Sequence, residues 1–431
     1  MRAIAARGSV AQSDRKYWRG VHAAEPVNGI PVGLVVQNQG VPQDVRVATF
    51  GRTLARAGYT VEIIAPSRPG QARDELIDGY TVHRFPEPPD GVGAVGYAWE
   101  VTVSLWRILR AQSRLPDADS WRILHLCNPP DVLWAPFGTI TRQAIRIYDH
   151  HDLAPELYLA KGGRPGSAAH RALLRMERWA NHWADLVIVP NESYAAITAS
   201  RGHVSPERIH VVRNAPRADI WYPVPRDESL REGADFVVCY VGSIGTQDGV
   251  AELIRAMSSV RKTDVSRKYL CLVVGSGAAL PGLQELASGL GLTDTVRFLG
   301  WIGDARRVRD IIASSDVGIE PCPLNAFNAS STMIKLTEYL ATGRPVVAYD
   351  LPEHRVTAGD AGVFVPPSLG HDGLARAIVQ MAANPSDLKA LADKAAQRLG
   401  NADLSDAVAE RALLRAYDQA RQLGRSRGAP W

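Results

Sequence analysis

The chain has 431 residues, of which 46% are hydrophobic and 22% are charged, as is typical of a folded soluble protein. This length suits two or three domains, and the composition excludes a disordered regulator, a collagen-like fibre and a small disulfide scaffold. The 49 lysines and arginines exceed the 45 acidic residues by only four, so we expect no nucleic-acid partner. The four cysteines form no C-x-x-C pair and lie in apolar runs, which indicates buried thiols in a reducing compartment, the cytoplasm.

We expect neither a secretory signal nor a membrane span in the first part of the chain. Residues 1–30 lack a sustained apolar segment and predict a disordered leader. The most apolar stretch, 91–109, contains two charged residues and is too polar to span a bilayer. Within it Trp99, Val103 and Trp106 recur at helical spacing, which predicts a helix that packs its aromatic face into the core. The alternative is peripheral contact with a membrane surface, where tryptophan is favoured.

Short apolar runs alternate with amphipathic stretches over residues 31–215, a pattern typical of a parallel sheet covered on both faces. One amphipathic helix is expected at 44–58. Strands are expected at 31–37, 60–66, 81–86, 122–127, 145–152, 185–191 and 208–214. The sequence therefore predicts an N-terminal Rossmann-like domain over 31–215.

The pattern breaks at residues 216–235, where three prolines and a charged run predict a hinge linker. It then restarts, which predicts a second Rossmann-like domain over 236–400 with the apolar segments FVVCYVGS, YLCLVVGSG, TVRFLGW, VGIEPCP and PVVAYD. A final amphipathic helix within 401–431 either caps the second domain or crosses back to the first. The predicted class is α/β, with two doubly wound units whose strand carboxyl ends face one cleft suited to two substrates.

The segment SSTMIKLTEYLATGRPVVAYD, which begins at Ser330, shows the strongest signals for a binding site. Ser330, Ser331 and Thr332 are expected to cap a helix whose free N–H groups favour an anion such as diphosphate. Lys335 and Glu338 are three residues apart and share one helix face. Either they form a surface ion pair, or the lysine lies near phosphate while the carboxylate accepts hydrogen bonds from ribose hydroxyls.

KLTEYLATGRPVVA resembles the nucleotide-binding helix of retaining GT-B glycosyltransferases of the family 4 type, the glycogen-synthase and mannosyltransferase superfamily. Four further segments between about residues 31 and 400 agree in order: NQGVPQDVRVATFGRTLARAGYTVEIIAP, CYVGSIGTQDGVAELIRAM, LCLVVGSGAALPGLQELASGLGLTDTVRFLGWI and DVGIEPCP. The resemblance implies a GT-B fold and retaining transfer of a sugar from a nucleotide-sugar donor. The acceptor is a carbohydrate, a lipid-linked molecule or a small molecule. No cofactor is expected, because the nucleotide sugar is a substrate.

The resemblance also implies which residues bind the donor: Gly242, Ser243, Gly245, Gly275, Ser330, Ser331, Thr332, Lys335 and Glu338. Three positions depart from the family pattern. Ser330 stands eight residues before Glu338, where an acid is usual, and Ser243 and Asp248 replace the usual arginine and lysine. Similar departures occur in bacterial polysaccharide branches of the family. We therefore expect Lys335, the helix N-terminus and the amides of 242–245 to hold the diphosphate without a divalent metal.

The segment YDHHDLAPE, directly after an expected strand, resembles the family's loop near the transferred sugar. Its spacing favours His151 over His150 as a catalytic residue, with Lys335 as the second. A metal site in this segment is disfavoured, because successive strand residues point to opposite faces. On the first helix, Arg46, near Gly40, either binds an acceptor phosphate or lies on a solvated helix face.

Two weaker motifs point elsewhere. Gly275 and Gly277 suggest a dinucleotide-binding loop, but its third glycine is missing. Asp117 and Asp119 mimic a metal-binding D-x-D but stand in a polar turn segment. Two other functions fit the same fold: a sugar-nucleotide epimerase or hydrolase, and a non-catalytic subunit of a glycan assembly complex. The sugar, the base, the acceptor and the oligomeric state are not determined by the sequence.

Overall fold

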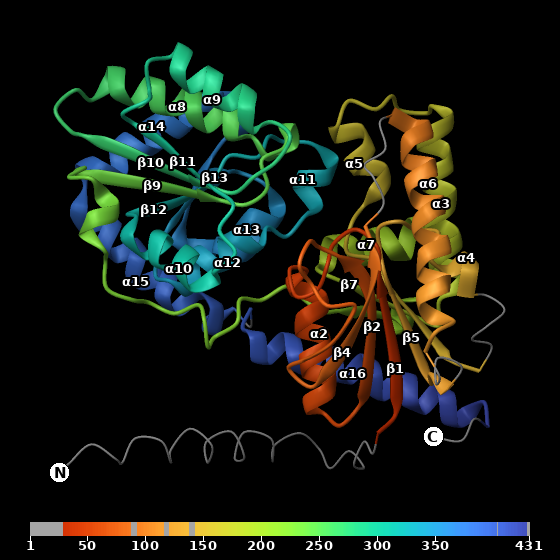
Figure 1. Ribbon diagram of the computed structural model, residues 1–431. Coiled ribbons are helices and arrows are strands. Elements are labelled where there is room, and N and C mark those ends of the chain that lie inside the picture. The colour runs from red at the N-terminus through yellow and green to blue at the C-terminus, as the bar shows by residue number, and fades with distance from the viewer. Residues whose placement is uncertain (1–28, 88–92, 116–119, 138–142, 403, 429–431) are drawn as a thin grey trace, which may run out of the picture.

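The computed structural model describes residues 29–87, 93–115, 120–137, 143–402 and 404–428. These residues form two α/β units side by side, each built on its own β-sheet (Figure 1). The predicted class, two doubly wound parallel units, is confirmed. The predicted leader lies outside the described residues except at its last two positions.

The N-terminal sheet has eight strands in the order β3-β4-β2-β1-β5-β6-β7-β8. All neighbours are parallel except β3, a polar edge strand that runs antiparallel to β4 and that the hydrophobic pattern did not predict. The strands are β1 Pro31–Val36, β2 Thr60–Ser67, β3 Asp74–Ile77, β4 Tyr80–Pro86, β5 Ile123–Cys127, β6 Ile145–Asp149, β7 Leu186–Val189 and β8 Ile209–Val211. Parallel strands need crossovers, and these place the helices on both faces.

The N-terminal helices are α2 Val45–Arg56, α3 Gly93–Gln112, α4 Trp134–Phe137, α5 Ala154–Ala160, α6 Ala168–Trp183 and α7 Glu192–Arg201. Helix α2 begins where the Asp44 carboxylate accepts from the N–H of Val47, at 3.0 Å. It packs on one face of the sheet with Leu34 and Ile63. Helices α3, α4 and α6 cover the opposite face.

Helix α3 does not bury its tryptophans, so the core-packing prediction for its aromatic stripe is wrong. Trp99 is 64% exposed and Trp106 is 57% exposed. The helix instead packs through Ile108 and Ala111, which lie on its other side. Periodicity identifies a stripe of this kind but does not determine whether the stripe faces the sheet. Among the described residues, no helix combines the length and the apolar character needed to cross a bilayer.

The C-terminal sheet is fully parallel, in the order β11-β10-β9-β12-β13-β14. Its strands are β9 Phe236–Val241, β10 Tyr269–Val274, β11 Val296–Gly300, β12 Val317–Glu320, β13 Val346–Tyr349 and β14 Gly362–Val365. Its helices are α8 Val250–Thr263, α9 Leu280–Gly289, α10 Ala305–Ser314, α11 Ala326–Ser330, α12 Ile334–Ala341, α13 Pro352–Ala358, α14 Gly370–Ala383 and α15 Pro385–Asn401. The four cysteines are free and buried.

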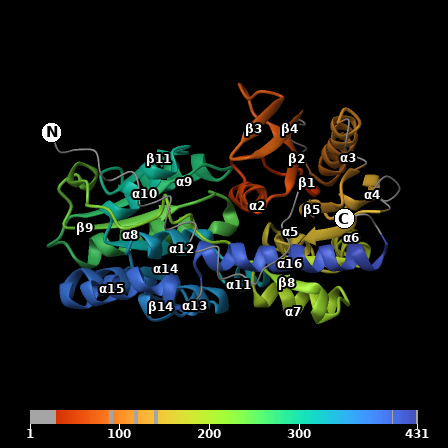
Figure 2. The same ribbon diagram turned by 90° about the horizontal axis from the view of Figure 1, so that it is seen from below.

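The chain crosses between the two units twice. Residues 216–235 lead into β9, and α16, Asp406–Ser426, returns from the second unit and lies under the N-terminal sheet (Figure 2). Leu413, Ala416 and Tyr417 of α16 belong to the same core cluster as α2. Tyr417 also places its hydroxyl 2.9 Å from Nδ1 of His125. The last helix is therefore part of the N-terminal core.

Candidate active site

Two glycine loops meet at the carboxyl ends of β9 and β10. Gly242 N–H donates to Val274 O at 3.0 Å, and Ile244 N–H donates to Ser276 O at 3.0 Å. Both Gly242 and Gly275 have positive φ, +146° and +143°. A Cβ on Gly275 would lie 1.8 Å from the carbonyl oxygen of Gly242, so this approach requires glycine. The structure thus brings together three loop residues expected at the donor site, Gly242, Ser243 and Gly275.

Most backbone N–H groups of residues 242–245 already donate hydrogen bonds within the protein. Besides the bonds of Gly242 and Ile244, Gly245 N–H donates to the Asp248 carboxylate at 2.8 Å. Among the described residues, Ser243 is the one of these four whose N–H has no acceptor. The expectation that all four amides bind diphosphate is therefore wrong. Burial raises the pKa of Asp248, although nearby Lys335 opposes the shift.

Lys335 lies against the glycine loop but is not a free cation. Its Nζ is 2.9 Å from Oε2 of Glu320 and 3.2 Å from the Tyr240 hydroxyl. A Cβ on Gly242 would lie 3.2 Å from the same Nζ. Burial would lower the pKa of Lys335, but Glu320 outweighs it and holds the pKa above its ordinary value. The lysine is therefore charged and already paired, and its partner is Glu320, not Glu338.

Glu338 stands one turn further along α12. Its side chain is partly buried, and among the described residues none forms a hydrogen bond or ion pair with its carboxylate. Burial raises its pKa to about 7, although nearby Lys335 opposes the shift. A partly buried carboxyl group with no internal partner has its hydrogen-bonding capacity free for a ligand.

Residues 330–332 do not cap α12, so this expectation is wrong. The N-cap is Met333, with no side-chain hydrogen bond. Asn191, at the start of α7 in the other domain, donates its amide N–H to Ser330 O and to Thr332 Oγ1, both at 2.8 Å. Ser331 Oγ lies 3.3 Å from the Tyr194 hydroxyl. These residues bind the two domains together instead.

A second group of polar residues forms contacts between the two domains close to Asn191. Ser193 Oγ donates to the Glu353 carboxylate at 2.6 Å, and the Arg213 guanidinium lies 3.6 Å from it. At another point, the guanidinium of Arg68 lies 5.8 Å from the ring of Trp301, which is 60% exposed. Arg68 follows β2 and Trp301 follows β11, so both stand at strand carboxyl ends. The interface therefore brings the carboxyl edges of both sheets together.

His151 occupies the carboxyl end of β6 in the N-terminal domain. Its side chain is 12% exposed, and Nδ1 lies 3.2 Å from Oδ2 of Asp149. The Asn128 side-chain oxygen accepts from the N–H of His151 at 2.9 Å and of Asp152 at 3.0 Å, which sets the direction of the loop. Burial would lower the pKa of His151, but Asp149 outweighs it and raises the pKa. The dyad orients the ring and favours its protonated form.

His150 points the other way, into the core. Its ring stacks on Tyr148 at 5.3 Å, and Nδ1 lies 3.0 Å from the Thr198 hydroxyl. Nε2 lies 3.5 Å from the buried Glu177 carboxylate. The side chain is fully buried. His150 therefore stabilises the domain, as the alternation of strand side chains predicts.

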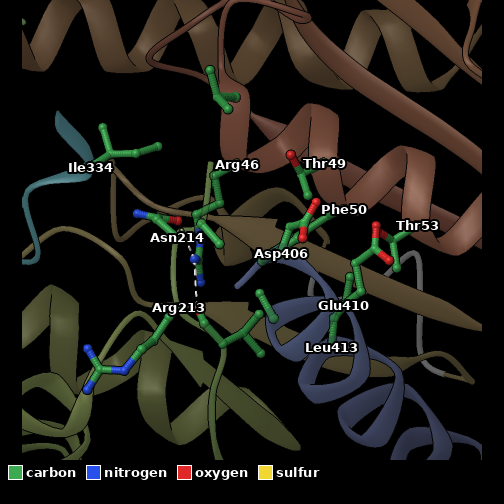
Figure 3. Close-up of a pocket in the computed structure, with 14 residues that line it drawn as sticks. Arg46, Thr49, Phe50, Thr53, Arg213, Asn214, Ile334, Asp406, Glu410 and Leu413 are labelled. Carbon is green, nitrogen blue, oxygen red and sulfur yellow. Dashed lines mark hydrogen bonds between the residues drawn. The ribbon is translucent and has the colours of Figure 1, made fainter. Parts of the chain in front are cut away.

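Arg46 is buried, so its solvated-helix alternative is wrong. Its Nε and Nη2 donate to both oxygens of Asp149, at 2.8 Å and 2.7 Å. Nη1 donates to Val212 O at 2.9 Å and to Asn214 Oδ1 at 2.7 Å (Figure 3). Burial would raise the pKa of Asp149, but Arg46 and His151 outweigh it and hold the pKa well below its ordinary value. The guanidinium acts on His151 through Asp149, and its donors are not free for an acceptor phosphate.

A pocket lies at the junction of α2, α16 and the C-terminal domain (Figure 3). Arg46, Phe50 and Asn214 line one part of it, and Glu410 of α16 lines another. Ile334, the residue before Lys335, also contributes. Gly40 stands just before this region, where its carbonyl accepts from the Asp44 N–H at 2.8 Å. Arg46 thus has its donors bound within the protein, and Gly40 has only backbone groups to offer an acceptor.

Among the described residues, His125, Cys127 and Asp149 place ligand atoms within 4.8 Å of one another. Arg46 already binds both oxygens of Asp149, and a cation there would face this guanidinium at short range. The group therefore does not fit a metal ion. Asp117 and Asp119 lie outside the described residues.

Sequence reasoning missed the partners of the expected site residues. Glu320 was available as the last residue of the strand in VGIEPCP, and Asp149 as the first acid of YDHHD. Asn191 carries no signal in the sequence beyond its position after a strand. All three are fully buried. Each acts on a site residue far from it in the chain or on the opposite domain.

Two family models match the chain, one for each domain. Residues 43–216 match Glycosyltransferase Family 4, and residues 235–384 match Glycosyl transferases group 1. A D-inositol 3-phosphate glycosyltransferase of Thermomonospora curvata is 26% identical over 76% of this chain and 79% of its own. A 2-deoxystreptamine glucosyltransferase of Streptomyces kanamyceticus is 23% identical over 71% of this chain and 80% of its own.

Solved structures share the fold. Sucrose-phosphate synthase from Thermosynechococcus elongatus has a TM-score of 0.72 at 20% identity, over 92% of this chain and 99% of its own. Anabaena HepE in complex with UDP and glucose has a TM-score of 0.67 at 17% identity, over 90% and 99%. The chain is therefore a glycosyltransferase of the GT-B fold, with a Glycosyltransferase Family 4 domain followed by a group 1 glycosyl transferase domain.

Proposed function

We propose that this enzyme transfers a sugar from a nucleoside diphosphate sugar to a hydroxyl acceptor, with retention and without a divalent metal. The observation that carries the proposal is the free carboxyl group of Glu338, one turn from Lys335, whose Nζ lies against Gly242 of the loop after β9. A carboxylate with both oxygens free can accept from the two hydroxyls of a ribose. HepE, which has the same fold, is described in complex with UDP.

In the proposed reaction, the two domains have different tasks. The C-terminal domain holds the nucleotide through Glu338, and Lys335, the Ser243 N–H and the start of α12 stabilise the leaving diphosphate. The N-terminal domain presents His151 to the transferred sugar, with Asp149 orienting the ring. Lys335 is paired with Glu320, so the positive charge available to the diphosphate is small. This supports a role for the helix terminus and the loop amide in place of the arginine and lysine of the family pattern, whose positions here hold Ser243 and Asp248.

The acceptor belongs to the carbohydrate, lipid-linked or small-molecule classes. Two of the relatives are named for small polyhydroxylated acceptors, an inositol phosphate and an aminocyclitol. We propose that the acceptor enters between the domains near Gly40 and His151. The four free cysteines support a reaction in the reducing cytoplasm.

Glu338→Gln is expected to weaken UDP binding by roughly tenfold to a hundredfold, since hydrogen bonds to a charged group contribute about 1.5–3 kcal/mol. Isothermal titration calorimetry with UDP measures the change. Glu285→Gln, at an exposed position on α9, is the matched control and should bind UDP as the wild type does. Equal UDP affinity in Glu338→Gln and the wild type would contradict the assignment of the nucleotide site.

UDP affinity is expected to rise with pH and to level off above about pH 7. The raised pKa of Glu338, about 7, means that the free enzyme holds a proton on this group at lower pH. Hydroxyl donors favour the ionised form, so binding releases this proton, and affinity falls by up to about tenfold per pH unit below 7. Calorimetry in buffers of different ionisation enthalpy detects the proton. The release should be absent in Glu338→Gln, and its persistence there would assign it to another group.

EDTA is expected to leave turnover unchanged, because the proposed diphosphate site uses N–H groups and Lys335 rather than a metal ion. Loss of activity on chelation, with recovery in magnesium or manganese, would contradict this part of the proposal. Donor hydrolysis or epimerisation at the full rate without any acceptor would instead indicate the epimerase or hydrolase alternative.

A further inference from the structure

Three carboxyl groups act on Lys335 in the C-terminal domain. Glu320 pairs with its Nζ at 2.9 Å. Burial raises the pKa of Asp248 and of Glu338, and in both cases Lys335 opposes the shift. A diphosphate adds further negative charge, and phosphate groups bind most strongly where a cation faces them. Lys335 by itself therefore leaves a bound diphosphate short of positive charge.

Helix α11 connects the loop that ends at Asp248 with the N-terminal domain. Asn328 of α11 donates its side-chain N–H to Gln247 O at 3.1 Å. Phe327 packs against the N-terminal core cluster that contains Leu153, the N-cap of α5. Helix α11 also contacts α5 itself, and both figures show the two helices side by side (Figures 1 and 2). Helix α5 of the N-terminal domain therefore lies beside the loop of the donor site.

Lys161 is the C-cap of α5, and its charge reaches the donor site. Burial raises the pKa of Asp248, and Lys161 is one of the charges that oppose this shift, together with Lys335. The Lys161 side chain is exposed, and none of the described carboxylates forms an ion pair with it. Lys161 is therefore a cation from the opposite domain with its ammonium group available to a ligand.

Two other cations of the N-terminal domain near the interface already have partners. Arg46 donates to both carboxylate oxygens of Asp149. The guanidinium of Arg213 lies 3.6 Å from the carboxylate of Glu353. These pairs are buried or nearly buried, and breaking them would leave a buried carboxylate without its partner. Lys161 can bind an anion without that cost.

The segment that follows Lys161 leaves space around it. Gly162 and Gly166 have φ of +89° and +68°, and at neither does any atom lie within 4 Å of the place that a Cβ would take. The backbone conformation, and not crowding, therefore calls for glycine at both positions. Arg164 is a second exposed cation, and residues 157–167 contain no acid. This end of α5 is positively charged and open to a phosphate.

We propose that Lys161 binds the diphosphate of the donor from the N-terminal domain and supplies the positive charge that Glu320 withdraws from Lys335. This inference rests on the proposed function, since it takes residues 242–248 as the diphosphate site. The diphosphate then lies between the Ser243 N–H of one domain and Lys161 of the other. As the bond between the sugar and the diphosphate breaks, its electron pair stays on the diphosphate, and Lys161 stabilises this charge.

Lys161→Gln is expected to weaken UDP binding by at least about fivefold, the effect of a unit charge about 4 Å away in bulk water. Uridine has the ribose but no phosphate, so its affinity should equal that of the wild type. Added salt should weaken UDP binding in the wild type and should do so less steeply in Lys161→Gln, because one ionic contact is gone. Calorimetry with UDP and with uridine, at low and at high salt, measures these differences.

Two rescue variants and a matched control accompany this test. Lys161→Arg keeps the charge and should keep most of the UDP affinity. Ser243→Arg/Lys161→Gln places a new cation at an exposed position of the loop and should recover part of the affinity that Lys161→Gln loses. Between residues 29 and 215 the sequence has no lysine besides Lys161, so the control is Lys389→Gln, at an exposed position on α15. It should bind UDP as the wild type does.

The outcomes separate this inference from the proposed function. Wild-type UDP affinity in Lys161→Gln, with a loss in Glu338→Gln, would overturn the role of Lys161 and leave the nucleotide site in place. Equal losses for UDP and uridine, or no recovery in Lys161→Arg, would also overturn it, because they would leave Lys161 only a structural role at the helix end. Absence of UDP binding in the wild type would contradict the proposed function, and this inference with it.

Discussion

Replacing His151 with alanine is expected to lower turnover by about 10²–10⁴-fold, the range that a positioned acid–base group supplies, while UDP affinity changes little. His151 stands at the carboxyl end of β6, in the domain opposite Glu338 and Lys335. Its Nδ1 is held by Asp149 at 3.2 Å. Turnover is measured with whichever UDP-sugar the wild type consumes, and UDP binding is measured by calorimetry.

His150→Gln is the neighbouring control. Its ring is fully buried and contacts Tyr148 and Thr198, so the substitution should lower the temperature of unfolding without removing turnover. Normal turnover in His151→Ala together with loss of turnover in His150→Gln would show that the catalytic residue is His150 and not His151. Normal turnover in both variants would make this loop structural.

Arg46→Met is expected to lower the free energy of unfolding by about 3–5 kcal/mol, because it leaves the buried Asp149 carboxylate without its main partner. Turnover should fall as well, since Asp149 orients His151. Urea unfolding, followed by a signal of the N-terminal domain, measures the stability change. The loss should shrink as the pH falls, because an unpaired Asp149 can then bind a proton.

The double variant Arg46→Met/Asp149→Asn distinguishes two causes of the stability loss, the broken ion pair and the lost packing of the guanidinium. The double variant removes the buried charge together with its partner, so it should recover part of the stability that Arg46→Met loses. It should not recover turnover, since His151 then lacks its carboxylate. A double variant less stable than Arg46→Met would show that packing of the guanidinium, and not its charge, is what stabilises this region.

The architecture follows from local patterns in the sequence. Continuous apolar runs separated by amphipathic stretches determine buried parallel strands with helices between them, and this holds for both domains. The polar edge strand β3, Asp74–Ile77, has no such run, and only its pairing with β4 makes it a strand. Strand alternation likewise separates the directions of His150 and His151 without any knowledge of the fold.

The partners of the site residues were decided by the tertiary structure. Lys335 meets Glu320, Arg46 meets Asp149, and Thr332 meets Asn191 of the other domain. Each pair joins distant segments, so no local spacing encodes it. The tryptophan stripe of α3 shows the same limit, because helical periodicity defines a face but packing on the sheet decides whether that face is buried. The sequence by itself thus determined the elements and the nature of the site. Burial and long-range pairing, which depend on how the two sheets come together, decided which charges stay free for a ligand.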